Sequence, residues 1–146
     1  MTHKILFVVA HPDDESLWIG GILNFLSNRE EVEPYVLCAT GRHHPERYKE
    51  FESVMNLIGI DNWYVADEDI PERGGIPLNE FPKSFVNGLE SLELNPEDID
   101  VIITHPFHGD EHLHGQHAQL FAGLFYLCKD KGVPFGFFST VVIRYY

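Results

Sequence analysis

Apolar runs alternate along the chain with longer stretches that carry apolar residues at helical spacing. The first run, residues 4–10 (KILFVVA), is continuous and rich in β-branched residues, which is typical of a strand buried on both faces. Further runs predict strands over residues 32–40, 62–65, 100–104 and 135–146. Helices are predicted over residues 16–27, 45–58, 81–92 and 116–131.

Two of the predicted helices have expected core faces. In the helix over 16–27 we expect the core side to carry Leu17, Ile22, Phe25 and Leu26, and in the helix over 116–131 it carries Leu120, Leu124 and Leu127. Pro45 and Gly59 stand at the first turn and just past the end of the second helix, as both residue types prefer. Because strands and helices alternate, we expect an α/β fold with a parallel sheet, and residues 1–146 read as one domain.

Composition narrows the function classes. The 44% hydrophobic content indicates a folded globule, and the net charge of -13 argues against nucleic acid and anionic membranes as partners. Cys38 and Cys128 are isolated, which favours two buried thiols. The apolar run after Lys4 is too short for a signal peptide or a membrane span, so a cytoplasmic protein is expected.

Two predicted strands run into unusual polar segments. The first leads into His11-Pro12-Asp13-Asp14-Glu15, and the strand over 100–104 leads into residues 105–117 (HPFHGDEHLHGQH), which hold five of the nine histidines. Ligands of open parallel sheets sit beyond the carboxyl ends of the strands.

Histidine and carboxylate side chains at these ends predict a divalent metal site, because catalytic zinc uses three such ligands and a water. His11 and Asp14 can face one ion from a tight loop, with a third ligand from the histidine segment and Asp13 as the base that takes a proton from water. The alternative is that the acids only cap the following helix. It leaves His11 and the histidine segment unexplained. A dinucleotide site is rejected, because GxGxxG is missing and three carboxylates would repel a pyrophosphate.

The segment AHPDDE at residues 10–15, followed by Gly20-Gly21 and a later HxxH, resembles the LmbE-like, or PIG-L-type, zinc-dependent N-deacetylases. Thr40-Gly41 and the R-x-x-E helix over 47–59 are similar to further parts of that family. The resemblance implies a Rossmann-like, open and mostly parallel sheet with helices on both faces. It also implies a bound zinc ion, or another divalent ion such as iron, and removal of the acetyl group from an N-acetylglucosamine-containing or related acetamido sugar.

The resemblance also implies roles for single residues. The metal ligands fall on His11, Asp14 and His117, the general base on Asp13, and oxyanion binding or protonation of the amine on His114. HxxH also occurs at 105–108, but the pair at 114–117 opens a predicted helix and is preferred. We expect the remaining histidines to be solvated side chains, namely His3, His43, His44, His105, His108 and His112.

Arg47 is the candidate for contacts with sugar hydroxyls or an anionic substituent, ahead of Arg42; a surface pair with Glu50 is an equal alternative. Asp67 and Asp69 in the polar loop over 66–77 are expected to be a solvated rim rather than sugar ligands.

Two departures from the family pattern bear on these roles. Gly115-Gln116 stand where the family often has Pro-Asp inside HxxH, so Gln116 can accept a hydrogen bond but supplies no charge. The sequence ends at Tyr146, soon after the histidine segment, so a compact member, a truncated domain and a homo-oligomer that shares its pocket all stay open. Hydrolysis of another amide, and a metal-binding module without turnover, are the alternative functions.

Overall fold

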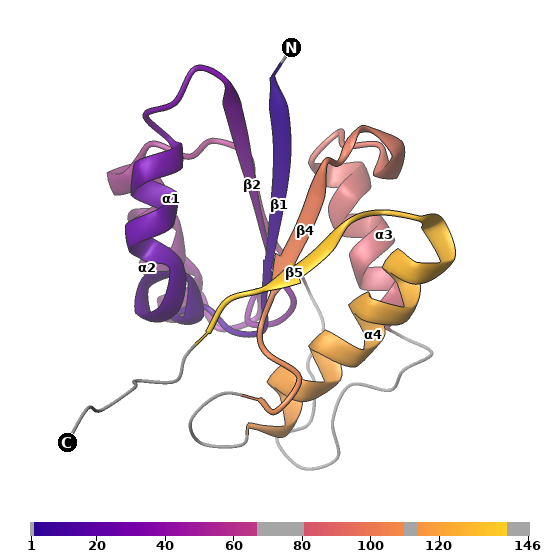
Figure 1. Cartoon of the computed structure of the whole chain (residues 1–146). Helices are drawn as coiled ribbons and strands as arrows, with labels where there is room; N and C mark the ends of the chain where they lie inside the picture. Colours follow the sequence, from indigo (N-terminus) through magenta and orange to yellow (C-terminus); the bar gives the residue numbers. More distant parts are fainter. Residues whose placement is uncertain (1, 67–80, 110–113, 140–146) are drawn as a thin grey trace, which may run out of the picture.

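Five parallel strands form the centre of the fold. The computed structural model describes residues 2–66, 81–109 and 114–139, with the backbone alone for 81–84. The strand order is β3-β2-β1-β4-β5, and every pairing is parallel. Figure 1 labels β1, β2, β4 and β5 of this sheet. The strands are β1 (His3–Val9), β2 (Val32–Cys38), β3 (Trp63–Val65), β4 (Val101–Thr104) and β5 (Phe135–Phe137).

Helices cover both faces of this sheet, so the α/β fold with a parallel, Rossmann-like sheet is confirmed. In Figure 1, α1 and α2 lie on one side of the sheet, and α3 and α4 lie on the other. The helical elements are η1 (Glu15–Ile19), α1 (Gly20–Leu26), α2 (Pro45–Ile58), α3 (Phe81–Ser91), η2 (Pro96–Asp98) and α4 (Gly115–Lys131).

The central strand β1 feeds two separate cores because its side chains alternate between the faces. Phe7 and Val9 belong to the cluster beneath α1 and α2, whereas Leu6 and Val8 belong to the cluster beneath α3 and α4. On α4, Leu120 and Leu124 are fully buried in the second cluster and Leu127 packs against it, which confirms the predicted stripe.

The expected core face of the first helix is wrong for three of its four residues. Leu17 is 65% exposed, Ile22 and Phe25 are also exposed, and the buried side chains are Ile19 and Leu23. Leu17 lies within η1, a π-helix, and Ile22 and Phe25 follow it. A π-turn contains one residue more than an α-turn, so it rotates the side chains that follow by about 100° relative to the predicted α-helix. Only Leu26 packs against the core as expected.

The remaining sequence predictions concern α2, the cysteines, β5 and the polar loop. Helix α2 begins at Pro45 and ends before Gly59, whose φ of 78° is the left-handed geometry that glycine adopts freely. Cys38 and Cys128 are free, buried thiols, as predicted. Strand β5 is shorter than predicted within the part that the structure describes, and the predicted rim with Asp67 and Asp69 lies outside it. None of the helices described is long and apolar enough to cross a membrane.

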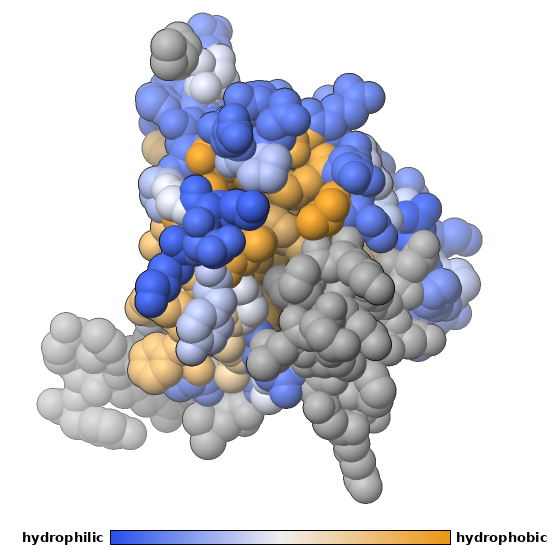
Figure 2. All heavy atoms as spheres, turned by 90° about the vertical axis from the view of Figure 1, so that its right-hand side faces the viewer, coloured by the Kyte–Doolittle hydropathy of each residue, from blue (hydrophilic) through white to orange (hydrophobic). Residues whose placement is uncertain are grey.

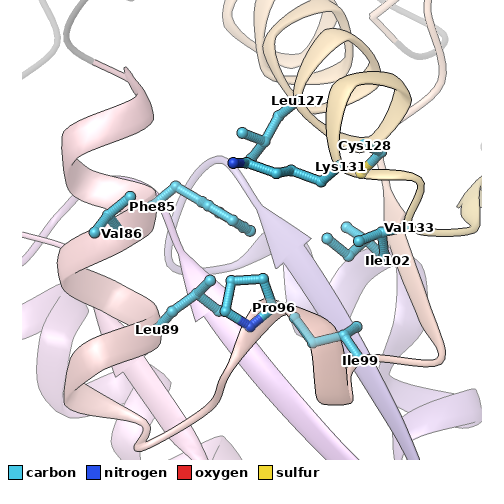
Figure 3. Close-up of a pocket in the computed structure, with 10 residues that line it drawn as sticks. All are labelled: Phe85, Val86, Leu89, Pro96, Ile99, Ile102, Leu127, Cys128, Lys131 and Val133. Carbon is cyan, nitrogen blue, oxygen red and sulfur yellow. The ribbon is translucent and has the colours of Figure 1, made fainter.

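An apolar cavity lies near the amino ends of β4 and β5, where α3, α4 and η2 meet (Figure 3). Figure 2 shows apolar side chains on this face of the molecule, between hydrophilic surfaces. The volume of the cavity is about 70 Å³. We call it the amino-end cavity; its lining is Phe85, Val86, Leu89, Pro96, Ile99, Ile102, Leu127, Cys128, Lys131 and Val133.

Candidate metal centre

The candidate site lies at the opposite, carboxyl ends of β1 and β4. These neighbouring strands mark the point where the strand order reverses, because the chain moves from β1 outward to β2 and β3 before it returns to β4. Two buried hydroxyls tie the strand ends together: Thr40 Oγ1 donates to the Ala10 carbonyl at 2.8 Å, and Thr104 Oγ1 donates to the Val8 carbonyl at 2.7 Å. The loops after β1 and β4 therefore start side by side.

Two glycines allow these loops to pack closely. A Cβ on Gly41 would collide with the Pro12 ring, and a Cβ on Gly109 would collide with the His114 carbonyl oxygen. Both residues also have φ angles near the left-handed region, 102° and 77°. Gly109 accepts a hydrogen bond from the His114 backbone N–H at 2.8 Å, which fixes the start of α4 against the end of β4.

Asp14 is the centre of the site and is only 4% exposed. The His11 backbone N–H donates to its Oδ2 at 2.8 Å, and the Trp18 indole N–H donates to its Oδ1 at 3.3 Å. Three imidazole nitrogens then face the same Oδ2: His11 Nδ1 at 3.3 Å, His105 Nε2 at 3.3 Å and His117 Nε2 at 3.4 Å. The carboxylate is therefore held in one orientation by groups from three parts of the chain.

The predicted ligands His11, Asp14 and His117 fit a divalent metal ion. Their donor atoms are 3.3, 3.4 and 3.2 Å apart, the last distance joining His11 Nδ1 to His117 Nε2. Ligand atoms 2.0–2.1 Å from one tetrahedral zinc ion are about 3.3 Å from each other. Ordinary N–H···O hydrogen bonds are about 2.9–3.0 Å long. Two sets of three side chains have their ligand atoms within 4.8 Å of one another. One set is His11, His114 and His117, and the other is Asp14, His105 and His117.

The charges of these groups are strongly coupled. Burial raises the pKa of Asp14, but the contacts with His105, His11 and His117 outweigh burial and lower that pKa well below its ordinary value. Burial lowers the pKa of His11, but the contact with Asp14 and its charge outweigh burial and raise that pKa. For His105 burial is the stronger influence and lowers the pKa, so this imidazole stays neutral. The site thus holds an ionised carboxylate among donor nitrogens, as a cation site requires.

Gln116, which stands where the family often has an aspartate, contacts the ring of His11. Its Oε1 accepts a hydrogen bond from His11 Nε2–H at 2.5 Å. With one proton on Nε2, the other nitrogen, Nδ1, faces Asp14 and His117, and its lone pair is available to a metal ion when Nδ1 is deprotonated. A ligating histidine that donates its second N–H to a neighbouring acceptor is the usual arrangement in metal proteins.

His114 and His117 lie at the start of α4, with different exposure. His117 is buried, whereas His114 precedes the helix and is exposed. The two rings stack with centroids 4.4 Å apart, and the His114 ring is 4.9 Å from that of His11. His114 is therefore the imidazole on the solvent side of the cluster.

Asp13 and Arg47 form an ion pair at the open side of the site. Arg47 Nη2 is 2.7 Å from Asp13 Oδ2, and both side chains are about half exposed, at 43% and 51%. Among the described residues Arg47 pairs with Asp13 and not with Glu50, so the surface-pair alternative is wrong. The expected base and the expected substrate-binding residue thus lie together.

Glu15 directly follows Asp14 and is buried, with 1% of its surface exposed. Its Oε2 accepts a hydrogen bond from the Asp13 backbone N–H at 2.9 Å. Burial raises the pKa of this carboxyl to about 7, and the nearby Asp13 and Asp14 charges add to the increase.

His105 is the site residue that sequence reasoning missed. We expected a solvated loop histidine, but its side chain is 0% exposed and contacts Asp14, so that prediction is wrong. The available signal was its position: it follows a buried strand directly, as His11 nearly does. His3, His43 and His44 are exposed as predicted, His108 is partly buried, and His112 lies outside the described residues.

Curated relatives of this chain are sugar deacetylases. It is 26% identical over 130 residues to a 1D-myo-inositol 2-acetamido-2-deoxy-α-D-glucopyranoside deacetylase from Corynebacterium diphtheriae, over 70% of this chain and 44% of the relative. It is 50% identical over 35 residues to a probable N-acetylglucosaminyl-phosphatidylinositol de-N-acetylase from Schizosaccharomyces pombe, over 24% of this chain and 14% of the relative. The chain thus spans less than half the length of these relatives.

Solved structures share the fold at low sequence identity. A deacetylase solved in complex with teicoplanin has a TM-score of 0.66 and 12% identity, over 90% of this chain and 68% of the other. A 4-carboxy-2-hydroxymuconate hydratase, GalB, from Pseudomonas putida KT2440 has a TM-score of 0.61 and 13% identity, over 86% of this chain and 55% of the other. No family model matches the chain. The similarity to LmbE-like, PIG-L-type deacetylases is confirmed by the curated relatives, and the fold by these structures.

Proposed function

We propose that this chain is a metal-dependent N-deacetylase that hydrolyses the acetamide of an N-acetylglucosamine-containing or related sugar. The observation that carries the proposal is the convergence of His11 and Asp14 with His117, 106 residues away, at ligand-like distances. The relatives' names supply the substrate class, because both act on an acetamido sugar.

His11, Asp14 and His117 would hold the ion, with zinc favoured by two imidazoles and one carboxylate. When bound, a divalent ion supplies Lewis acidity, which polarises the acetamide carbonyl and makes water more acidic. Asp14 needs no proton exchange for this role, because its contacts keep it ionised.

Asp13 and His114 would divide the proton transfers between them. Asp13, half exposed at the open side, takes a proton from the attacking water while Arg47 holds its Oδ2. The C–O bond forms first and gives a tetrahedral oxyanion. The C–N bond then breaks and the proton ends on the leaving amine, so acetate and a free amino sugar result. His114, on the solvent side, stabilises the oxyanion or delivers the proton to nitrogen. Arg47 is also placed to meet sugar hydroxyls or an anionic substituent.

Two other functions use the same residues. The chain could hydrolyse another amide, because the donors act on the amide group and not on the sugar. It could also bind metal without turnover. The shared fold with a hydratase shows that this fold does not by itself determine the reaction. A cytoplasmic location stays a prediction from the sequence.

The test is metal analysis paired with a deacetylation assay. Protein as purified is analysed for metal, and amine release is measured from N-acetylglucosamine, from 2-acetamido-2-deoxy-glucosyl-myo-inositol and from a simple N-acetylated amine. We expect about one divalent ion per chain and turnover of an acetamido sugar that a chelator abolishes. Asp13→Asn keeps the ion but loses turnover at least about 100-fold, whereas Asp61→Asn, an exposed aspartate, changes neither.

Each opposite result has a defined meaning. Turnover that survives complete metal removal contradicts the proposal. Turnover of the simple amide alone points to the second function, and bound metal without turnover of any substrate points to the third.

A further inference from the structure

We propose that His105 is a positioning residue of the metal centre, which holds Asp14 and His117 in place from the buried side. The proposal rests on the metal binding proposed above and assigns a role to a residue outside the expected ligand set. His105 directly follows β4, so the strand itself carries its imidazole into the protein interior.

The ring of His105 touches both residues that it is proposed to position. Its Nε2 lies 3.3 Å from Asp14 Oδ2. Its face stacks on the His117 ring, with centroids 3.8 Å apart and planes 23° apart. The Phe138 ring also packs against it, with centroids 4.8 Å apart. Rotation of either ligand would therefore require His105 to move, and His105 is enclosed.

A buried histidine at this position is costly for folding unless its polar atoms are needed. Within the described structure, Nδ1 of His105 is buried and has no hydrogen-bond partner. An unsatisfied buried polar atom costs about 1–3 kcal/mol. A leucine would fill much of the same space without that cost, but it could offer Asp14 no polar contact. The contacts made through Nε2 and the ring face are what histidine adds here.

The orientation of the ring favours positioning over direct ligation. The near-parallel stacking on His117 makes the in-plane lone pairs of the two rings run side by side instead of converging on one ion. His105 thus supports the ligands instead of joining them.

The experiment compares metal affinity in His105→Leu, His105→Gln and a matched control, His108→Leu, from the same segment. Metal-free full-length protein is titrated with Zn²⁺ in competition with a chromophoric chelator, and the visible spectrum of the Co²⁺-loaded protein reports the ligands. We expect His105→Leu to bind one ion about 10–100-fold more weakly, with unchanged Co²⁺ band positions. His105→Gln should recover part of the loss, because its amide reaches toward Asp14 where Nε2 did, and His108→Leu should stay within about twofold of wild type.

Circular dichroism of the metal-free variants checks folding. If His105→Leu does not fold, His105→Gln is compared with His105→Asn, whose shorter amide lies where Nδ1 did. Tighter binding by the glutamine variant supports the proposal, and equal binding overturns it.

Two results overturn the inference while the proposed function stands: wild-type affinity in His105→Leu, or a Co²⁺ spectrum that shows the loss of a nitrogen ligand. Failure of the wild-type protein to bind any divalent ion contradicts the proposed function itself.

Discussion

The two ends of the central sheet are built on opposite principles. At the carboxyl end, β1 and β4 lead into loops whose charged and imidazole side chains turn inward and contact one another around Asp14. At the amino end, the same β4 borders the amino-end cavity, whose lining is apolar except for Lys131. At the carboxyl end, polar donor atoms are buried away from water, which costs free energy. At the amino end, mostly apolar side chains surround a small cavity.

Because of this difference, we expect metal binding to depend on one end of the sheet and folding stability on the other. Changes at the carboxyl end should alter metal binding and turnover with moderate effects on folding. Changes at the amino end should do the reverse.

The strongest test of the comparison is His117→Ala. This change removes a donor that faces both Asp14 and His11, so we expect metal affinity to fall at least about 1000-fold and turnover to vanish. Chelator competition and amine release measure the two effects. His108→Ala is the control, since it removes a histidine of the same segment. Tight metal binding by His117→Ala would remove this residue from the ligand set.

Leu89→Ala tests the other end of the sheet. Leu89 is 4% exposed and lines the amino-end cavity, so truncation enlarges the cavity and should lower the free energy of unfolding by about 2–4 kcal/mol. Urea denaturation measures this loss. Zn²⁺ affinity of the folded variant should stay within about twofold of wild type, and a larger change would show that the two ends are coupled.

Gln116→Ala sharpens the picture of the carboxyl end. It removes the acceptor that holds His11 Nε2–H, so His11 can rotate or change tautomer, and metal affinity should fall about 10-fold. Gln116→Glu should restore or exceed wild-type affinity, because a carboxylate accepts the same hydrogen bond more strongly. Gln119→Ala, one turn along α4, is the control. Equal affinities in all three variants would mean that Gln116 does not orient His11.

Glu15→Gln gives the smallest effect, a change in the pH dependence of stability. The carboxyl pKa is raised to about 7 in the folded, metal-free chain from an ordinary value near 4.5. Between these pH values the folded chain binds a proton that the unfolded chain has released, so the free energy of unfolding falls as pH rises from about 4.5 to 7. The contribution is below about 1.4 kcal/mol per pH unit.

Urea denaturation of metal-free wild type and Glu15→Gln from pH 4.5 to 8 isolates this contribution, because other groups titrate in both proteins. The wild type should lose stability more steeply in that window. Glu50→Gln, an exposed glutamate, should follow the wild type, and parallel curves for Glu15→Gln would contradict a raised pKa.

The secondary structure was predictable wherever local chemistry decides it. Pro45 and Gly59 mark the ends of α2 because they act on their own backbone, and the continuous apolar run of β1 is readable because both faces of that strand are buried. The core face of the first helix was predicted wrongly, since the π-helix η1 changes the helical register at its start and the buried stripe is Ile19, Leu23 and Leu26.

By itself, the sequence determined that carboxylates and histidines stand at the ends of two buried strands, and hence which residues were candidates for a metal. Only the tertiary structure decided which nitrogens meet Asp14, because side chains 91 and 103 positions away face it only once β4 pairs with β1 and α4 folds back across the sheet. For that reason His105, which the sequence placed among solvated loop residues, lies buried behind the ligands. Local rules describe neighbours along the chain, whereas burial and convergence depend on contacts between distant segments.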